Sequence, residues 1–598
     1  ISSFILSRTL VPTMAKFLLK PHAQDNKQEH DHQQGPRVSS NPLVRFQRGF
    51  ERGFERIRMN YSGILELLLK HRRMFVLGFF GFVLLSFALV PFLGRNFFPD
   101  VDAGQILLHV RAPIGTRIET TSEIFAEVEN RVRETIPRSE LGTVVDNMGL
   151  STSSINTAYN NTGTIGPQDG DIQISLNEGH HPTAGYVRTL REQLPRAFPG
   201  VTFSFPPADI VGQILNFGSP APIDLQVRGR NLPADFAYAN VLLREIRHIP
   251  GVVDARIEQS QASPQFNIDV DRVHAQLQGI TERDVTNSLV VHLAGSGQIA
   301  PTYWLNPANG VEYPIVVQTP QYGLDSLPSL MNLPVTGAGA AANDGQILAG
   351  VATIHRTAAN EVVSDYNVQP MVEIFATTQG RDLGAVAAGI HEIVAAHAAG
   401  VPKGAKVVLL GQVQTMNSAF GDLLFGLLGA VVLIYLLIVI NFQSWTDPLV
   451  IVTALPGALA GIVWMLFATH TTLSVPALTG AIMCMGVATA NAILVVSFCR
   501  ERLAEHGDAF KAALEAGSTR FRPVLMTALS MIIGMSPMAL ALGEGGEQNA
   551  PLGRAVIGGL LFATVATLFL VPAVFCIFHS HRGHAAPAPI PGGPTHVV

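Results

Sequence analysis

LSVPALTGAIMCMGVATANAILVVSF, residues 473–498, runs its whole length without a Lys, Arg, Asp or Glu. An α-helix rises about 1.5 Å per residue, so roughly 20 apolar residues cross the hydrocarbon layer of a membrane. Asp422 is the only Lys, Arg, Asp or Glu in five other stretches of similar length: 74–94, 420–440, 449–469, 523–542 and 555–578. The sequence therefore predicts an α-helical membrane bundle.

The composition agrees with this prediction. The 598 residues are 47% hydrophobic and only 14% charged, which favours a membrane protein over a soluble one. The net charge of −5 gives no support for a nucleic acid partner. All three cysteines lie in or beside apolar stretches, so we expect no disulfides in the polar part of the chain. The opening segment, 1–20, is predicted to be the end of an incomplete transmembrane helix.

A polar region, 95–417, lies between the first apolar stretch and the other five and is large enough for two or more domains. Its pattern repeats as strand, amphipathic helix and strand, in units that begin near Gln105, Ile172, Ile223 and Met371. Such repeats predict an α+β fold of ferredoxin-like βαβ subdomains. A small α+β piece, 264–296, is expected as an insertion.

Basic residues near the apolar stretches predict the orientation of the loops. Lys and Arg are concentrated in 37–73 and in the loop 499–522, which we expect to be cytoplasmic. Alternation then places 95–417 outside, five transmembrane helices in 418–578 and a cytoplasmic tail at 579–598. Within the linker 21–73, RFQRGFERGFERIR (45–58) predicts an amphipathic helix on membrane lipids, or alternatively a solvated linker helix.

Polar side chains inside the apolar stretches are the first functional candidates. Asn491 has four hydrogen-bonding opportunities at membrane depth and must find partners inside the bundle. It either holds helices together or belongs to a proton or ion path. Thr527 and Arg520 are open to the same two interpretations, since Thr527 can bond its own helix backbone and Arg520 can reach the headgroups. Asp422 is interpreted as a hydrated acid at a helix end.

Metal and enzyme sites are not predicted. His30, His32, His579, His581 and His584 fall in low-complexity segments, which favours incidental histidines over a metal site. Export of a soft metal favours Met or Cys pairs in the outer region, where the methionines are scattered. We find no nucleophile–base pair and no motif of an enzyme.

Several motifs together resemble the resistance-nodulation-division (RND) exporters, most of all their hydrophobe and amphiphile efflux branch. They are RNFFPDVDAGQILLHVRAPIGTRIE (95–119), INFQSWTDPLVIVTALPGALAG (440–461), GVATANAILVVSF (486–498), RFRPVLMTALSMIIGMSPMAL (520–540) and PLGRAVIGG (551–559). The resemblance implies that 95–417 forms periplasmic porter and docking subdomains. It also implies that the chain is the C-terminal portion of an inner-membrane permease, whose N-terminal half is missing here.

The resemblance implies roles for particular residues. Asn491 matches a family motif on the helix that faces the proton-carrying acidic pair of the other half, and Thr527 and Arg520 match supporting polar positions. Ala490 stands where better-known drug exporters carry a lysine, so the mode of proton coupling is open. The stretch LSTSSINTAYNNTGTIGPQDG (150–170) holds no Phe, which argues against an aromatic trap and makes a smaller or more polar substrate plausible.

The function implied is efflux of hydrophobic or amphiphilic small molecules by proton antiport. The resemblance implies no cofactor beyond the proton gradient, and as partners a homotrimer, a periplasmic adaptor protein and an outer-membrane channel. A metal-ion exporter of the same superfamily and a non-transporting membrane receptor or assembly module are the alternatives. We expect the 598 residues alone not to pump, because no acid lies at mid-membrane.

Overall fold

The computed structural model describes residues 9–10, 13–14, 42–150, 163–216, 218–337, 345–543 and 545–580. The chain divides into two units, Ile1–Ile64 and Leu65–Val598. Most of segment 1–20 lies outside the described residues, as do 21–41 of the linker and 581–598 of the tail. The helix predicted for 45–58 is confirmed as part of α2 (Pro42–Lys70), while its contact with lipids stays a prediction.

Six helical segments in the described part of the chain are long and apolar enough to cross a membrane, in agreement with the six predicted stretches. Their bounds are α3 (Arg72–Phe87) with a 3-10 turn (Val90–Phe92), α13 (Gln412–Phe442), α14 (Thr446–Val452) with α15 (Ala454–Ala468), α16 (Val475–His506), α17 (Ala509–Ala539), and α18 (Ala550–Val565) continuing through a π segment (Ala566–Leu570) into α19 (Val571–His579). Several helices extend beyond the apolar stretch, because a helix continues into polar residues at the membrane surface.

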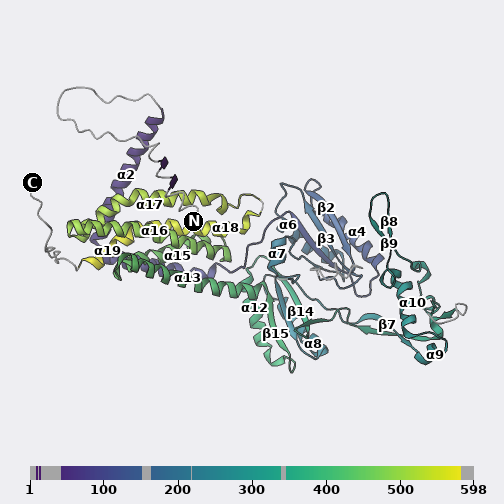
Figure 1. Cartoon of the computed structure of the whole chain (residues 1–598). Helices are drawn as coiled ribbons and strands as arrows, with labels where there is room; N and C mark the ends of the chain where they lie inside the picture. The colour runs from purple at the N-terminus through teal and green to yellow at the C-terminus, as the bar shows by residue number, and fades with distance from the viewer. Residues whose placement is uncertain are drawn as a thin grey trace, which may run out of the picture. The chain divides into compact units, whose positions relative to one another are not determined.

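Three of the spans form the centre of the bundle (Figure 1). The most apolar windows of the spans α14–α15, α16 and α18–α19 are 61, 56 and 67% buried, against 11, 6 and 17% for α3, α13 and α17. Small residues permit the close approach: a Cβ added at Gly480 of α16 would lie 2.8 Å from the carbonyl oxygen of Leu552 on α18. Glycine at such positions lets helix backbones pack closely in a membrane.

The first outer subdomain has the predicted ferredoxin-like fold. Its elements are β1 (Gln105–Arg111), α4 (Ile118–Thr135), β2 (Leu141–Met148), β3 (Asp169–Leu176), α6 (Thr183–Ala197) and β4 (Thr202–Ser204). The strands lie in the order β2-β3-β1-β4, and every pair is antiparallel. Two of the predicted strand–helix–strand units therefore combine into one sheet, whose core includes Leu108, Phe125 and Leu190.

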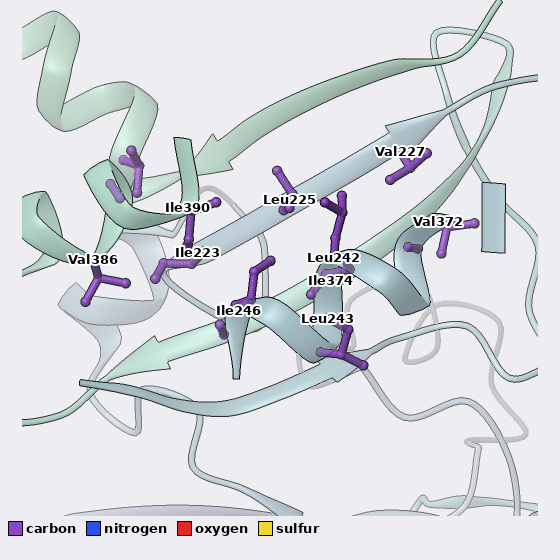
Figure 2. Close-up of a cluster of buried hydrophobic side chains, with 14 of the residues drawn as sticks. Ile223, Leu225, Val227, Leu242, Leu243, Ile246, Val372, Ile374, Val386 and Ile390 are labelled. Atoms are coloured by element: carbon purple, nitrogen blue, oxygen red, sulfur yellow. The ribbon is translucent and has the colours of Figure 1, made fainter. Parts of the chain in front are cut away.

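The second subdomain repeats this topology from the other two units. It contains β5 (Ile223–Arg228), α8 (Leu232–Ile246), β6 (Val252–Ile257), β14 (Gln369–Thr378), α12 (Leu383–Ala396) and β15 (Lys406–Gly411). β5 lies between β14 and β15, and β14 also pairs with β6 and with β13 (Ser364–Tyr366). Figure 2 shows the core, in which Leu225 and Ile374 of the sheet meet Leu242 and Ile246 of α8.

The predicted insertion is present and longer than expected. β7 (Ser263–Val270) pairs with β12 (Ala352–Ala359) along its whole length, so the insertion extends well past residue 296. Between these strands lie α9 (Arg272–Leu277), α10 (Glu282–Ala294), the hairpin β8 (Thr302–Leu305) and β9 (Glu312–Ile315), α11 (Leu327–Met331), and the short pair β10 (Pro334–Val335) and β11 (Gln346–Ile347). A pairing between strands so distant in sequence is not visible to local periodicity.

Candidate functional site

Asn491 and Thr527, two of the three residues predicted to support proton movement, meet between α16 and α17. Asn491 is only 5% exposed, and Thr527 Oγ1 lies 3.1 Å from Asn491 Oδ1 and 2.9 Å from the carbonyl oxygen of Val524. A hydroxyl has one proton to donate, so Thr527 serves one of these acceptors at the expense of the other. The pair therefore has two alternative hydrogen-bonding arrangements within an apolar stretch. Its part in proton movement stays a prediction.

Arg520, the third predicted residue, does not join this pair. Its guanidinium lies 4.7 Å from the ring centre of Phe498, an arrangement that allows a cation–π interaction between α17 and α16. Its buried Nε has no hydrogen-bond partner in the described chain. Ala490 is exposed on α16 beside Asn491. Of the three candidates, Asn491 and Thr527 contact each other, and Arg520 contacts Phe498 instead.

One sequence expectation at the end of a helix is wrong. Asp422 is exposed as expected and lies within α13, which begins ten residues earlier at Gln412, so its place at the end of the membrane span stays a prediction. His579 does not belong to a low-complexity tail: it is the last residue of α19, 7% exposed, with Nε2 3.2 Å from Asp447 Oδ1. Asp447 Oδ2 lies 3.3 Å from Arg500 Nη1, so a buried carboxylate joins the ends of three spans.

A cavity of about 470 Å³ lies on the second sheet, on the face opposite α8 and α12. Side chains alternate across a strand, so the apolar residues of β5 enter the core while Asp224 and Gln226 line the cavity. Glu373 of β14 and Glu258, which follows β6, complete three carboxylates in its wall. No Lys, Arg or His contributes to the lining that the structure describes. The cavity is therefore acidic.

Asp224 is the most constrained of these carboxylates. It is 5% exposed, Oδ2 accepts a hydrogen bond from Gln226 Nε2 at 2.7 Å, and Oδ1 has no hydrogen-bond partner among the described residues. Burial, followed by the negative charge of Glu373, raises the pKa of Asp224 to about 7. Burial also raises the pKa of Glu373. A cation in the cavity would relieve both effects.

The carboxylates line the cavity without forming a finished ligand set. In the ranges that the structure describes, no three His, Cys, Asp or Glu side chains are close enough to hold one metal ion. Carboxylate and amide oxygens are hard ligands suited to divalent cations, and the cavity is large enough for an ion that keeps part of its water. The site can attract a cation and hold it loosely.

These carboxylates are not among the predicted site residues, although the sequence carries a signal for them. In Ile223-Asp224-Leu225-Gln226-Val227 and Met371-Val372-Glu373-Ile374-Phe375, a polar residue alternates with the apolar core residues. That alternation was used to predict strands, but it also indicates an acidic residue on the second face of the sheet. What it cannot show is that two such strands are neighbours, with Gln226 opposite Glu373.

Comparisons with known proteins agree with the fold. The sequence matches the AcrB/AcrD/AcrF family over residues 1–579. It is 28% identical to the nickel-cobalt-cadmium resistance protein of Alcaligenes xylosoxydans xylosoxydans, over 96% of this chain and 50% of the relative. It is 26% identical to the cobalt-zinc-cadmium resistance protein of Cupriavidus metallidurans, over 86% of this chain and 48% of the relative.

A solved structure is also similar. The X-ray crystal structure of a heavy metal efflux pump, crystal form I, superimposes with a TM-score of 0.73 at 24% identity, covering 88% of this chain and 52% of the pump. At this identity the likeness supports the fold alone. The chain spans about half the length of the curated relatives that it matches.

Proposed function

Because the chain belongs to the AcrB/AcrD/AcrF family of RND permeases, we propose that it takes part in proton-driven efflux of divalent metal cations. The family is one of transporters, and the chain is a multi-pass protein of the inner membrane with a large periplasmic region. The hydrophobe and amphiphile branch expected from the motifs is not confirmed. The relatives reported above are named for resistance to nickel, cobalt, cadmium and zinc, which favours the metal-export alternative.

The observation that carries this proposal is the buried carboxylate of Asp224, with one oxygen unpartnered in the described chain, in a cavity that it shares with Glu258 and Glu373. Glu258 is paired with Arg111, but neither Asp224 nor Glu373 has an ion-pair partner in the described chain, and a divalent cation would compensate their negative charge. Oxygen ligands favour harder cations over copper(I) or silver, which prefer Met and Cys. The scattered methionines of the outer region are consistent with this preference.

Proton coupling is assigned to the membrane bundle. We place Asn491 and Thr527 beside the proton path as groups that change hydrogen-bond partner, with Arg520 in support. Proton re-entry supplies about 2.3 kcal/mol per charge for each 100 mV of membrane potential. The proposed assembly is a homotrimer with the N-terminal half of the permease, a periplasmic adaptor protein and an outer-membrane channel.

Isothermal titration of Zn²⁺ into the purified chain tests the proposal. We expect Zn²⁺ to bind at pH 8, and binding to weaken as the pH falls below about 7, because protons then compete for Asp224. Asp224→Asn should weaken binding at least tenfold. Asp235→Asn is the matched control, because Asp235 in α8 is a buried carboxylate of the same subdomain that accepts no hydrogen bond from the described side chains and does not line the cavity.

Three results would contradict the proposal. Zn²⁺ binding that Asp224→Asn leaves intact would place the ion elsewhere. If Zn²⁺ does not bind and an amphiphilic dye binds saturably, the substrate belongs to the hydrophobe and amphiphile class that the motifs first implied. Binding of Zn²⁺ without any gradient-dependent export, in cells that also supply the N-terminal half of the permease, would instead indicate a receptor.

A further inference from the structure

Two arginine–carboxylate pairs join the outer subdomains, and both carboxylates belong to one segment of chain. In the first pair, Arg191 of α6 donates from Nε and Nη2 to the two oxygens of Asp254 on β6, at 2.8 and 2.7 Å. Asp254 also accepts the backbone N–H of Phe205 at 3.0 Å. This bidentate pair is fully bonded, which is the strong form of such a contact.

The second pair joins Arg111, at the end of β1, to Glu258, just after β6. Arg111 Nη2 lies 3.2 Å from Glu258 Oε1, and Nη1 donates to the carbonyl oxygen of Glu258 at 3.0 Å. Its Nε donates to Asp169 Oδ2 at 2.9 Å, within its own subdomain. Arg111 is therefore held in place whether or not the Glu258 carboxylate stays with it.

A buried histidine fixes Asp169 in turn. His109 is 1% exposed, with Nε2 2.9 Å from Asp169 Oδ1 and Nδ1 2.8 Å from Asp171 Oδ1. The Nε2 contact is close enough for an ion pair, but its geometry does not meet the criteria for a hydrogen bond. Burial opposes the charge on the ring, but the two carboxylates outweigh it and raise the pKa of His109. A positive charge on His109 favours the ionised form of Asp169, whose other oxygen accepts the hydrogen bond from Arg111.

Glu258 differs from Asp254 in two ways. It lines the acidic cavity with Asp224 and Glu373, whereas Asp254 does not. Its Oε2 has no hydrogen-bond partner in the described chain and lies 3.9 Å from Arg256 Nε, a long ion-pair distance. Glu258 thus has one oxygen bonded across the interface and another that accepts no hydrogen bond among the described residues, at the wall of the cavity.

We propose that Glu258 is a switch shared between the subdomain interface and the cation in the cavity. This inference rests on the proposed function. A divalent cation attracts a carboxylate twice as strongly as a guanidinium at the same distance, so an occupied cavity draws Glu258 away from Arg111. Arg111 then keeps only its hydrogen bond to the Glu258 carbonyl oxygen across the interface, beside that of Gln168 to Glu361, while Arg191 and Asp254 act as the hinge. Substrate arrival is in this way converted into a rotation between the two subdomains.

Spin-label distance measurements on the full 598-residue chain test the switch. Ala126 on α4 and Ala237 on α8 are exposed and lie on different subdomains, so Ala126→Cys and Ala237→Cys provide the label sites. The native cysteines Cys484, Cys499 and Cys576 are buried in the bundle. Zn²⁺ should move the main distance by more than about 2 Å, the size that distinguishes domain rearrangement from repacking of side chains.

Variants separate the switch from general weakening of the interface. Glu258→Gln keeps the shape and removes the charge, so it should show the shifted distance before Zn²⁺ is added. Glu361→Gln is the matched control. Glu361 accepts a hydrogen bond from Gln168 across the same interface at 2.7 Å but does not line the cavity, so this variant should respond to Zn²⁺ like the parent chain.

Titration of the same labelled samples with Zn²⁺ distinguishes the two possible failures. If Zn²⁺ binds and the distance stays unchanged, the switch is wrong and the proposed function stands. If Glu258→Gln without Zn²⁺ matches the parent chain, or Glu361→Gln loses the response, Glu258 is not the switch. If Zn²⁺ does not bind at all, both the proposed function and the switch are wrong.

Discussion

At the scale of single residues, the charged form of Asp224 favours cation binding but destabilises the fold when no cation is bound. Its pKa is raised from 3.8 to about 7, so between these values the folded chain holds a proton that the unfolded chain has lost. The folded state then binds more protons, and stability falls as the pH rises through this window. A cation restores what is lost above pH 7. The residue is therefore suited to holding substrate and unsuited to stabilising an empty domain.

Asp224→Asn should accordingly stabilise the empty chain. The amide keeps an acceptor for Gln226 and carries no charge, so we expect a gain on the order of 4 kcal/mol at pH 8 and little change near pH 4, since the pKa is raised by about three units and each unit corresponds to about 1.4 kcal/mol. Thermal unfolding of both chains at the two pH values measures the difference. Equal stability of the variant and parent at pH 8 would show that Asp224 is not buried as a charge.

Elements differ in how far the sequence predicts them. The six spans and the four strand–helix–strand units follow from apolar length and alternation, which are local properties. The pairing of β6 with β14, and of β7 with β12, joins segments about a hundred residues apart and leaves no local signal. The acidic cavity and the Arg111–Glu258 pair depend on these distant pairings, so their members were visible in the sequence but their meeting was not.

Helix packing within the bundle gives a prediction at the same scale. A Cβ at Gly480 would lie 2.8 Å from the Leu552 carbonyl oxygen, whereas one at Gly486, on the same helix, would meet nothing within 4 Å. Gly480→Ala should therefore destabilise the chain by about 1 kcal/mol, since overpacking of 1–3 kcal/mol exceeds the gain of about 1 kcal/mol in helix propensity.

Gly486→Ala is the matched control, because it gains helix propensity without bringing a Cβ against a neighbouring helix. Melting temperatures in one detergent compare the two variants, and we expect Gly480→Ala to melt below the parent and Gly486→Ala at or above it. A Gly480→Ala chain as stable as the parent would mean that α16 and α18 do not approach as closely as described.

At the scale of the whole molecule, hydrogen bonds connect the bundle to the second subdomain. Asn96 N donates to Leu473 O at 3.0 Å and Val475 N to Phe97 O at 3.1 Å, which ties the start of α16 to the segment after the first span. Asn96 Oδ1 in turn accepts the N–H of Leu383, at the start of α12, at 2.7 Å. Asn491 lies about 24 Å farther along α16 at 1.5 Å per residue. A shift of α16 therefore reaches the second subdomain directly.

Binding and transport should nevertheless separate in this chain. The described lining of the cavity comes from residues between Gly163 and Thr415, so we expect the 598 residues to bind Zn²⁺ without a second chain if the proposed function is right. Its apolar stretches hold no carboxylate near the depth of Asn491 that could carry a proton. In proteoliposomes with an imposed pH gradient and a trapped Zn²⁺ dye, we expect the flux of the parent chain to equal that of Asp224→Asn. A larger, uncoupler-sensitive flux in the parent would mean that Asn491 and Thr527 conduct protons without an acidic partner.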